Sequence, residues 1–171
     1  MRKILTCSLS FLLVFVFVSS VGAQDKLTPK EVIKTVNEAA EFLGKKGEDS
    51  FDVFNDEGNR FVSKEKNLYP YVAECAKNTA RAHPIKPELI GKDLSNLQDP
   101  KGNYFTLEIC MISEEHPERG GWIKYWWPKP GESEPSQKFA YVKKAEGTPY
   151  TVVAGFWSED FTVDKLNNML K

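Results

Sequence analysis

Three strand-like runs lie close together in the last third of the chain. They are WIKYWW (122–127), KFAYVKKA (138–145) and YTVVAGFW (150–157), all rich in aromatic and β-branched residues. The connections between them, PKPGESEPSQ and EGTP, carry the glycine and proline residues typical of turns. We therefore predict that the three runs pair in sequence order as an antiparallel meander.

The first of these runs carries large side chains on both faces. Side chains alternate along a strand, which separates Trp122, Lys124 and Trp126 from Ile123, Tyr125 and Trp127. Faces with so much apolar surface need a cover, and we expect a helix to cover the face of Trp122 and Trp126. The looped segment 82–102 would cover the other face. A cavity for a small ligand would remain there, lined by Tyr125 and Trp127.

Helix signals mark the start of the predicted domain. Thr28 and Glu31 have the spacing of a capping box, and apolar residues recur at helical spacing behind them. This pattern predicts an amphipathic helix that ends at Gly44 or Gly47. The following segment, residues 48–62, predicts one helical turn and then a loop.

The middle of the chain mixes short elements with loops. Residues 68–75 and 80–84 are predicted to form two strands joined by a turn, although Pro70 counts against the first. Residues 85–102 contain repeated glycine and proline and are expected to form a long structured loop. Residues 103–116 have apolar side chains at helical spacing and are predicted to be a second helix.

A further helix signal lies at the C-terminal end. Ser158 is placed to act as the N-cap of a short helix in SEDFTVDKLNNMLK. The order of an N-terminal helix, a loop-rich middle and an antiparallel sheet predicts an α+β domain.

Residues 1–23 have the three parts of a secretory signal peptide. MRK supplies the basic start, LSFLLVFVFV the apolar core and VGA the small-residue cleavage site. The apolar run is too short to span a bilayer and no second run follows it, so we expect no membrane insertion. Cleavage after Ala23 would release residues 24–171 as one exported domain, periplasmic or secreted.

The composition argues against several classes of function. A formal net charge of −1 provides no basic surface for nucleic acid or anionic lipid. The two histidines, His83 and His116, both precede proline, and no HExxH, HxxxH or GxSxG pattern is present. We therefore expect no enzymatic activity, no metal site and no cofactor.

Two cysteines, Cys75 and Cys110, remain after cleavage of the predicted signal peptide. Export would permit a disulfide between them, and two buried unpaired thiols are the alternative. The sequence leaves both alternatives open, since neither cysteine lies in a CxxC spacing that would indicate zinc or redox chemistry.

Four polar residues could donate hydrogen bonds to an anion in an otherwise apolar pocket: His83, Tyr125, Lys138 and Tyr141. Each also has a structural interpretation. A strand tyrosine is commonly a core residue, a lysine at a strand start is commonly solvated, and a histidine before proline commonly bonds to the backbone of a turn.

Several motifs together resemble a known family. They are AHP (82–84), PELIGKDLSNLQDPKGNYF (87–105), GGWIKYWWPKPG (120–131), PSQKFAYVKK (135–144) and VVAGFW (152–157). Their order and spacing resemble a single Cache domain, of the type found as the extracytoplasmic sensor of bacterial chemoreceptors and histidine kinases. The resemblance extends over nearly all of residues 24–171.

The resemblance implies a PAS-like fold, with a long N-terminal helix packed on an antiparallel sheet of about five strands. It also implies a pocket for a small organic molecule, often a short carboxylate such as acetate, propionate, pyruvate or lactate. By position, His83 and the loop after it would form the pocket lid, and Tyr125 and Trp127 its floor. Lys138 and Tyr141 would supply charge and hydrogen bonds.

Strand parity limits this assignment. Lys138 and Tyr141 lie on opposite faces of their strand unless a bulge intervenes, so one of them is expected to be structural. We favour Tyr141 as the pocket residue. The first hairpin also departs from the family pattern, because VAECAKNTARAHP lacks the usual turn glycine and places Cys75 at a strand position.

Receptors of this family continue into a transmembrane helix and a signalling domain, whereas this sequence ends at Lys171. We therefore expect an exported module that binds a small molecule and acts with a membrane receptor. The alternative is a structural or interaction domain that has kept the fold and lost the pocket.

Overall fold

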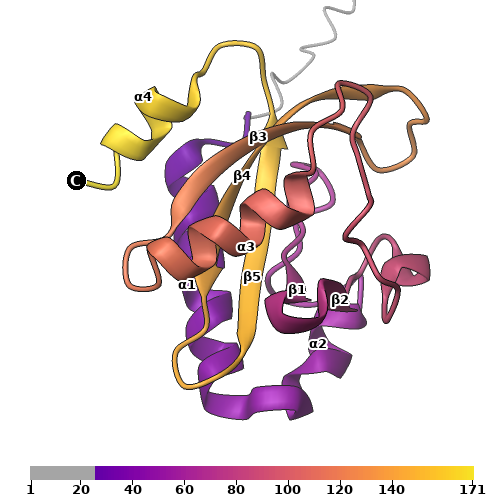
Figure 1. The fold of residues 1–171 in the computed structure, drawn as a ribbon, viewed down its shortest axis with the longest axis vertical. Helices are drawn as coiled ribbons and strands as arrows, with labels where there is room; N and C mark the ends of the chain where they lie inside the picture. The colour runs from indigo at the N-terminus through magenta and orange to yellow at the C-terminus, as the bar shows by residue number, and fades with distance from the viewer. Residues whose placement is uncertain (1–25) are drawn as a thin grey trace, which may run out of the picture.

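The sheet of the computed structural model has the strand order β2-β1-β5-β4-β3, and every neighbouring pair is antiparallel. The structure describes residues 26–171, so the predicted signal peptide lies outside the described part. The strands are β1 (Tyr71–Glu74), β2 (Thr79–Ala82), β3 (Gly121–Pro128), β4 (Pro135–Lys144) and β5 (Tyr150–Trp157). The helices are α1 (Pro29–Lys46), α2 (Phe51–Asn55), α3 (Phe105–Glu115) and α4 (Val163–Asn168). Figure 1 shows α1 and α3 on opposite faces of the sheet.

The long helix α1 begins and ends as its sequence predicts. The Thr28 hydroxyl accepts a hydrogen bond from the Glu31 amide at 3.3 Å, and the Glu31 carboxylate accepts one from the Thr28 amide at 2.8 Å. This capping box satisfies two amides that have no partner within the helix. Of the two glycines proposed as its end, Gly47 terminates α1 with a φ of 57°. Gly44 lies within the helix, where a Cβ would come within 2.9 Å of the Glu146 carbonyl oxygen.

The predicted meander is confirmed. Strand β4 pairs with β3 and β5 without a register shift, so that Lys138 lies opposite Tyr125 on one side and Trp157 on the other. Gly155 of β5 must be glycine, because a Cβ there would lie 2.0 Å from the Phe139 carbonyl oxygen. The apolar residues of α1 pack on the face of β4 and β5 that carries Phe139 and Tyr141.

The first hairpin is also confirmed, and its turn explains the missing glycine. Strands β1 and β2 are joined by a 3₁₀ turn, Cys75–Lys77, that ends in the left-handed conformation at Asn78, with a φ of 50°. Asparagine tolerates this conformation better than most residues, so it takes the place of glycine. Pro70 directly precedes β1 and interrupts no ladder.

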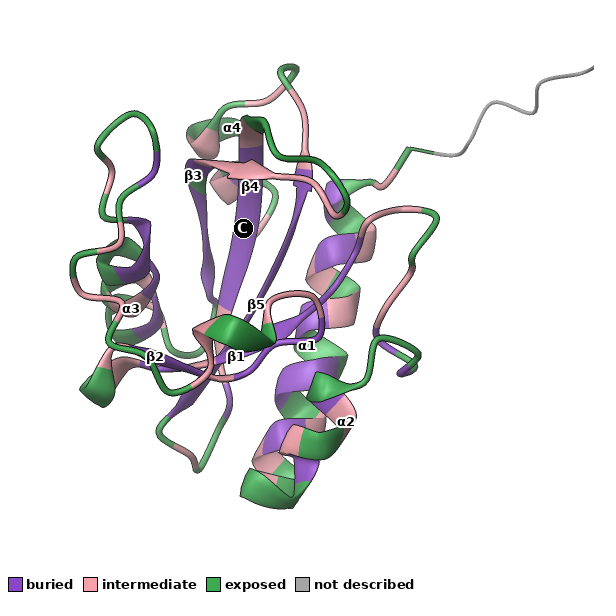
Figure 2. Ribbon diagram, turned by 90° about the vertical axis from the view of Figure 1, so that its right-hand side faces the viewer, coloured by how far each residue is buried: buried purple, intermediate pink, exposed green. Residues whose placement is uncertain are grey.

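The second face of the sheet has a different cover from the predicted one. We expected loops alone, but α3 also packs there, through Phe105 and Ile109 against Ile123, Tyr125 and Val142. Figure 2 shows the sheet between α1 and α3. The apolar spacing of α3 therefore reflects its burial against the sheet.

A disulfide ties α3 to the end of β1. The structure joins Cys75 to Cys110, with their Cα atoms 5.3 Å apart, and so has the bridge in place of two unpaired thiols. The bridge fixes one end of α3 beside the β1–β2 hairpin.

The last helix begins later than predicted. Thr162, and not Ser158, is the N-cap of α4, and its hydroxyl accepts a hydrogen bond from the Lys165 amide at 3.2 Å. The Ser158 hydroxyl instead accepts a bond from the Asp160 amide at 3.1 Å and stabilises a turn. Both residues have good capping chemistry, and the packing of Leu166 in the core decides between them.

None of the helices between residues 26 and 171 is long and apolar enough to cross a membrane.

Candidate functional site

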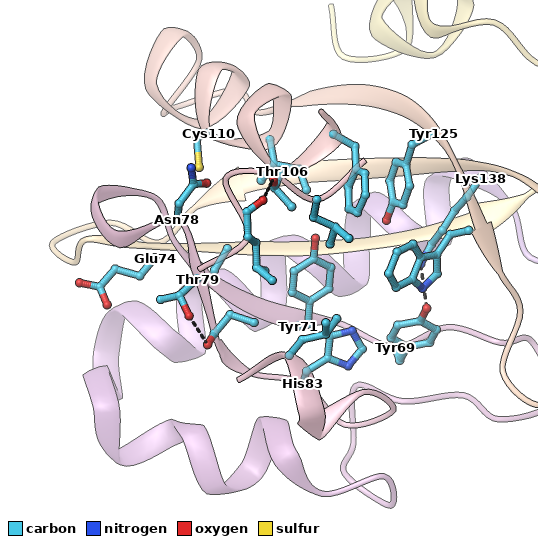
Figure 3. Close-up of a pocket in the computed structure, with 18 residues that line it drawn as sticks. Tyr69, Tyr71, Glu74, Asn78, Thr79, His83, Thr106, Cys110, Tyr125 and Lys138 are labelled. Atoms are coloured by element: carbon cyan, nitrogen blue, oxygen red, sulfur yellow. Dashed lines mark hydrogen bonds between the residues drawn. The ribbon is translucent and has the colours of Figure 1, made fainter. Parts of the chain in front are cut away.

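A pocket lies between the sheet and its α3 cover (Figure 3). One end is lined by polar and aromatic residues, namely Tyr69, Tyr71, His83, Tyr125, Trp127 and Lys138. The rest of the lining mixes apolar side chains, namely Leu89, Leu94, Leu97, Phe105 and Ile109, with the polar residues Glu74, Asn78, Thr79 and Thr106. The space open to the centres of water-sized molecules is about 30 Å³. One water needs about 10–15 Å³ on this measure, so the pocket suits a ligand of only a few non-hydrogen atoms.

Lys138 is the central charged group of the pocket. Its side chain is buried, with the whole residue 2% exposed, and its ammonium group donates a hydrogen bond to the Tyr69 hydroxyl at 3.0 Å. The Nζ atom also lies 4.4 Å from the ring centre of Tyr69 and 4.5 Å from that of Trp157. Burial lowers the pKa of Lys138 to about 7, because the charged form loses its hydration. Among the described residues no carboxylate forms an ion pair with it.

His83 lies beside Lys138 and is neutral. Burial is the main cause that lowers the pKa of His83 to about 3, and the positive charge of Lys138 is the second. Its Nδ1 atom accepts hydrogen bonds from the amides of Ile85, at 3.2 Å, and Lys86, at 2.9 Å. A neutral imidazole that accepts at Nδ1 carries its proton on Nε2, so His83 retains one donor.

Two tyrosine hydroxyls point into the same space. Tyr71 stacks on His83, with the ring centres 5.0 Å apart, and Tyr125 stacks on Phe105 at 4.4 Å. Figure 3 shows the hydroxyl ends of Tyr71 and Tyr125 directed towards the middle of the pocket. Burial raises the pKa of both hydroxyls, so both remain protonated donors. Neither makes a hydrogen bond to another residue in the range 26–171, and both are available to a ligand.

The loop over the pocket is held by backbone hydrogen bonds. The amides of Gly91 and Leu94 donate to the carbonyls of Ala80, at 3.0 Å, and Asn78, at 2.8 Å. Further along, the Asp99 carboxylate accepts a hydrogen bond from the Trp126 amide at 2.9 Å. The loop is therefore fixed to both edges of the sheet, which keeps its leucines over the pocket.

The structure brings four of the five proposed site residues together: His83, Tyr125, Trp127 and Lys138. Tyr141 lies on the opposite face of β4, where it packs against Trp122 and donates a hydrogen bond to the Arg119 carbonyl at 2.6 Å. Our preference for Tyr141 over Lys138 was therefore wrong. The parity argument itself holds, because β4 has no bulge between the two residues.

The tryptophans of β3 divide as their alternation predicts, with one qualification. Trp122 is buried in the core beneath α1, whereas Trp127 lines the pocket. Trp126 is only half-buried, and the ammonium groups of Lys101 and Lys124 lie 5.6 Å and 5.3 Å from its ring centre. Trp126 therefore does not belong to the core.

Sequence reasoning missed Tyr69 and Tyr71. Both lie in the run LYPYV, where an alternation of tyrosines on one side of a strand could have indicated a shared face. The contribution of α3, through Phe105 and Ile109, was missed because the pocket was expected to have a loop cover.

No cluster of three or more His, Cys, Asp or Glu side chains able to hold a metal occurs in the part of the chain that the structure describes.

Together, the fold and the pocket define a class of protein: an α+β domain that encloses a small pocket between an antiparallel sheet and one helix with its attached loop. The family model described as Cache domain matches residues 23–171, and the chain belongs to the Cache domain family. Members of this family in chemoreceptors are ligand-sensing domains, which confirms the predicted family, the PAS-like α+β fold and a sensory role.

Solved structures of other sensors share the fold. A Cache chemosensory domain whose structure was determined for carboxylic acid recognition matches with a TM-score of 0.61 and 23% identity, over 76% of this chain and 92% of that one. A periplasmic sensor domain of a chemotaxis protein matches with a TM-score of 0.58 and 22% identity, over 76% and 96%. A methyl-accepting chemotaxis protein from Vibrio parahaemolyticus matches with a TM-score of 0.58 and 17% identity, over 77% and 84%. At these identities the similarity shows the fold alone.

One relative is similar in sequence. The methyl-accepting chemotaxis protein McpP of Pseudomonas putida is 33% identical over 78 residues, which is 46% of this chain. The match covers 14% of that protein's length.

Proposed function

We propose that the protein is an exported sensory domain that binds a short organic carboxylate in the pocket around Lys138. The observation that carries this proposal is a buried lysine with no carboxylate ion-pair partner among residues 26–171, in a small pocket whose lining also includes several apolar side chains. An anion would supply the missing countercharge, and an apolar tail would lie against the leucines and Phe105. The fold of a Cache domain studied for carboxylic acid recognition, which this chain resembles, supports the same ligand class.

The arrangement of donors suits a carboxylate. Its two oxygens can accept several hydrogen bonds, and the pocket offers the Lys138 ammonium, the Nε2 proton of His83 and the hydroxyls of Tyr71 and Tyr125. The small cavity favours two- to four-carbon acids over longer ones. Residues 1–23 support export as a cleaved signal peptide, and similarity to chemoreceptor sensors supports a membrane receptor as partner.

Calorimetric titration of the purified protein tests this function. We expect acetate, propionate, pyruvate or lactate to bind, while the matching amides and amines do not. Lys138→Met should weaken binding by roughly 10- to 100-fold, the usual cost of losing a hydrogen bond to a charged group.

Two variants serve as matched controls. Lys124→Met removes an exposed lysine from the neighbouring strand, and Tyr141→Phe removes a hydroxyl from the opposite face of β4. Both should keep the wild-type affinity. The proposal fails if no carboxylate binds, a result that would favour a ligand-less interaction domain, or if Lys124→Met weakens binding as much as Lys138→Met.

A further inference from the structure

Lys138 is enclosed by neutral groups on every side. Tyr69 and Tyr71 face it from the β1 segment, His83 from the end of β2, Tyr125 and Trp127 from β3, and Trp157 from β5. The nearest acidic residue that lines the pocket is Glu74, which is already paired with Arg81 at 2.5 Å and Lys77 at 3.1 Å. Among the described residues the ammonium group is therefore stabilised by one hydroxyl and by aromatic rings, without a paired carboxylate.

We propose that carboxylate binding in this pocket is coupled to uptake of one proton by Lys138, so that the domain responds to acidity together with its ligand. This inference rests on the proposed function and adds a regulation to the same site. The bound species would be a carboxylate paired with an ammonium group, and above neutral pH the proton would come from solvent.

The electrostatic reason is that ligand binding changes the surroundings of the Lys138 ammonium group from neutral side chains to a negatively charged carboxylate. Without ligand, burial lowers the pKa of Lys138 to about 7, so much of the protein holds a neutral amine at neutral pH and above. A carboxylate beside Nζ favours the charged form and raises this pKa again. Binding must therefore be accompanied by proton uptake at every pH at which Lys138 is neutral in the free protein and charged in the complex.

The neighbouring titratable groups do not obscure this effect. The pKa of His83 is lowered to about 3, so its imidazole stays neutral throughout the range of pH 6–9. Burial raises the pKa of Tyr69, Tyr71 and Tyr125, so their hydroxyls stay protonated in the same range. Lys86 acts on His83 as a further positive charge, and it is not buried.

Two aromatic contacts oppose the loss of the proton. The rings of Tyr69 and Trp157 lie within 4.5 Å of Nζ and favour the ammonium form. The Trp157 ring is held in place because its Nε1 atom donates a hydrogen bond to the Trp127 carbonyl at 2.8 Å. These rings therefore offset part of the desolvation cost of charging Lys138.

Calorimetry across pH 6–9 tests the coupling, with acetate, propionate, pyruvate and lactate as probes. Each titration is repeated in two buffers of different ionisation enthalpy, because the difference in heat gives the number of protons taken up. We expect almost no uptake at pH 6 and nearly one proton at pH 8.5. The dissociation constant should rise about tenfold per pH unit above neutrality.

Two variants separate this coupling from general effects of mutation. Lys138→Arg keeps a permanent charge, so any binding it retains should be independent of pH. His83→Asn keeps an acceptor near the Nδ1 position and leaves Lys138 intact, so it should weaken binding yet keep the pH slope and the proton uptake. The His83→Asn result remains informative if the arginine variant does not fold.

The outcomes distinguish the two proposals. Binding by wild-type protein with no proton uptake and a constant affinity between pH 6 and 9 would overturn the coupling and leave the carboxylate site intact. Absence of binding by all four acids at every pH would overturn the proposed function itself, and the coupling with it.

Discussion

At the scale of single residues, Lys138 combines a cost to stability with a proposed role in binding. A buried ammonium group without a countercharge destabilises the folded protein, since its hydration is lost on folding. Groups with strongly perturbed pKa values occur most often at functional sites. Tyr71 and Tyr125 add hydroxyl donors that have no hydrogen-bond partner among residues 26–171.

This cost predicts how stability depends on pH. The pKa of Lys138 is about 7 in the folded protein, against an ordinary value of 10.5. Below pH 7 both states hold the proton and the folded protein bears the full cost of the buried charge. Between pH 7 and 10.5 the unfolded chain binds more protons, so the free energy of unfolding rises with pH, by about 1.4 kcal/mol per unit.

The substitution Lys138→Met removes the pH-dependent effect of this buried ammonium group on the free energy of unfolding. In the absence of ligand we expect the variant to be more stable than the wild type at pH 6, with an advantage that shrinks steadily from pH 7 to pH 10. Urea unfolding of both proteins across this range measures the difference. Parallel stability profiles would show that Lys138 binds its proton equally well in the folded and the unfolded protein, and would contradict the lowered pKa.

At the scale of elements, α3 connects the disulfide to the pocket. Its inner side places Phe105 and Ile109 in the lining of the pocket, and Cys110 joins it to the β1–β2 hairpin. The hydroxyl of Thr106 also donates a hydrogen bond to the Leu94 carbonyl at 2.9 Å, which holds the covering loop on the helix. The position of α3 therefore sets the shape of the cavity.

Removal of the bridge should loosen this cover. We expect the double substitution Cys75→Ser and Cys110→Ser to lower the free energy of unfolding by about 2–4 kcal/mol, since the bridge closes a loop between residues 35 apart in the sequence. Chemical denaturation measures the loss, and carboxylate affinity should fall as well. Reductant should lower the stability of the wild type to a similar extent and leave the double variant unchanged, and an equal response of both proteins would contradict the prediction.

At the scale of the whole molecule, the sheet separates an apolar core on one face from the pocket on the other. The face under α1 holds a continuous apolar core that includes Trp122, Phe139 and Phe156, whereas the α3 face contains the pocket. Adjacent residues of β4 thus lie on opposite sides, with Lys138 in the pocket lining and Phe139 in the core.

The proposed exported form predicts a specific covalent structure. Protein collected after export should begin at Gln24 and contain one disulfide. Intact mass spectrometry without reductant, followed by reduction and alkylation, checks both features in one sample. A retained N-terminus, or two cysteines that react with the alkylating agent before reduction, would contradict the prediction.

Much of the fold could be predicted because its signals are local. The capping box at Thr28 and Glu31, the alternation within β3 and the turn residues between the last three strands depend on neighbours in the sequence. The motifs from Ala82 to Trp157 were sufficient to identify the family. The predicted start of α4 was wrong because Ser158 and Thr162 have similar capping chemistry, and only packing distinguishes them.

The sequence by itself determined the α+β class, the meander and the separation of Lys138 from Tyr141, since strand parity is a property of the backbone. It did not determine which of those two residues faces the pocket, because that depends on which cover each sheet face receives. Only the tertiary structure placed Lys138 on the sheet face that α3 covers and Tyr141 on the face that α1 covers. A lysine that would be solvated on an open strand is thereby buried among tyrosines, and its altered charge state follows from that packing alone.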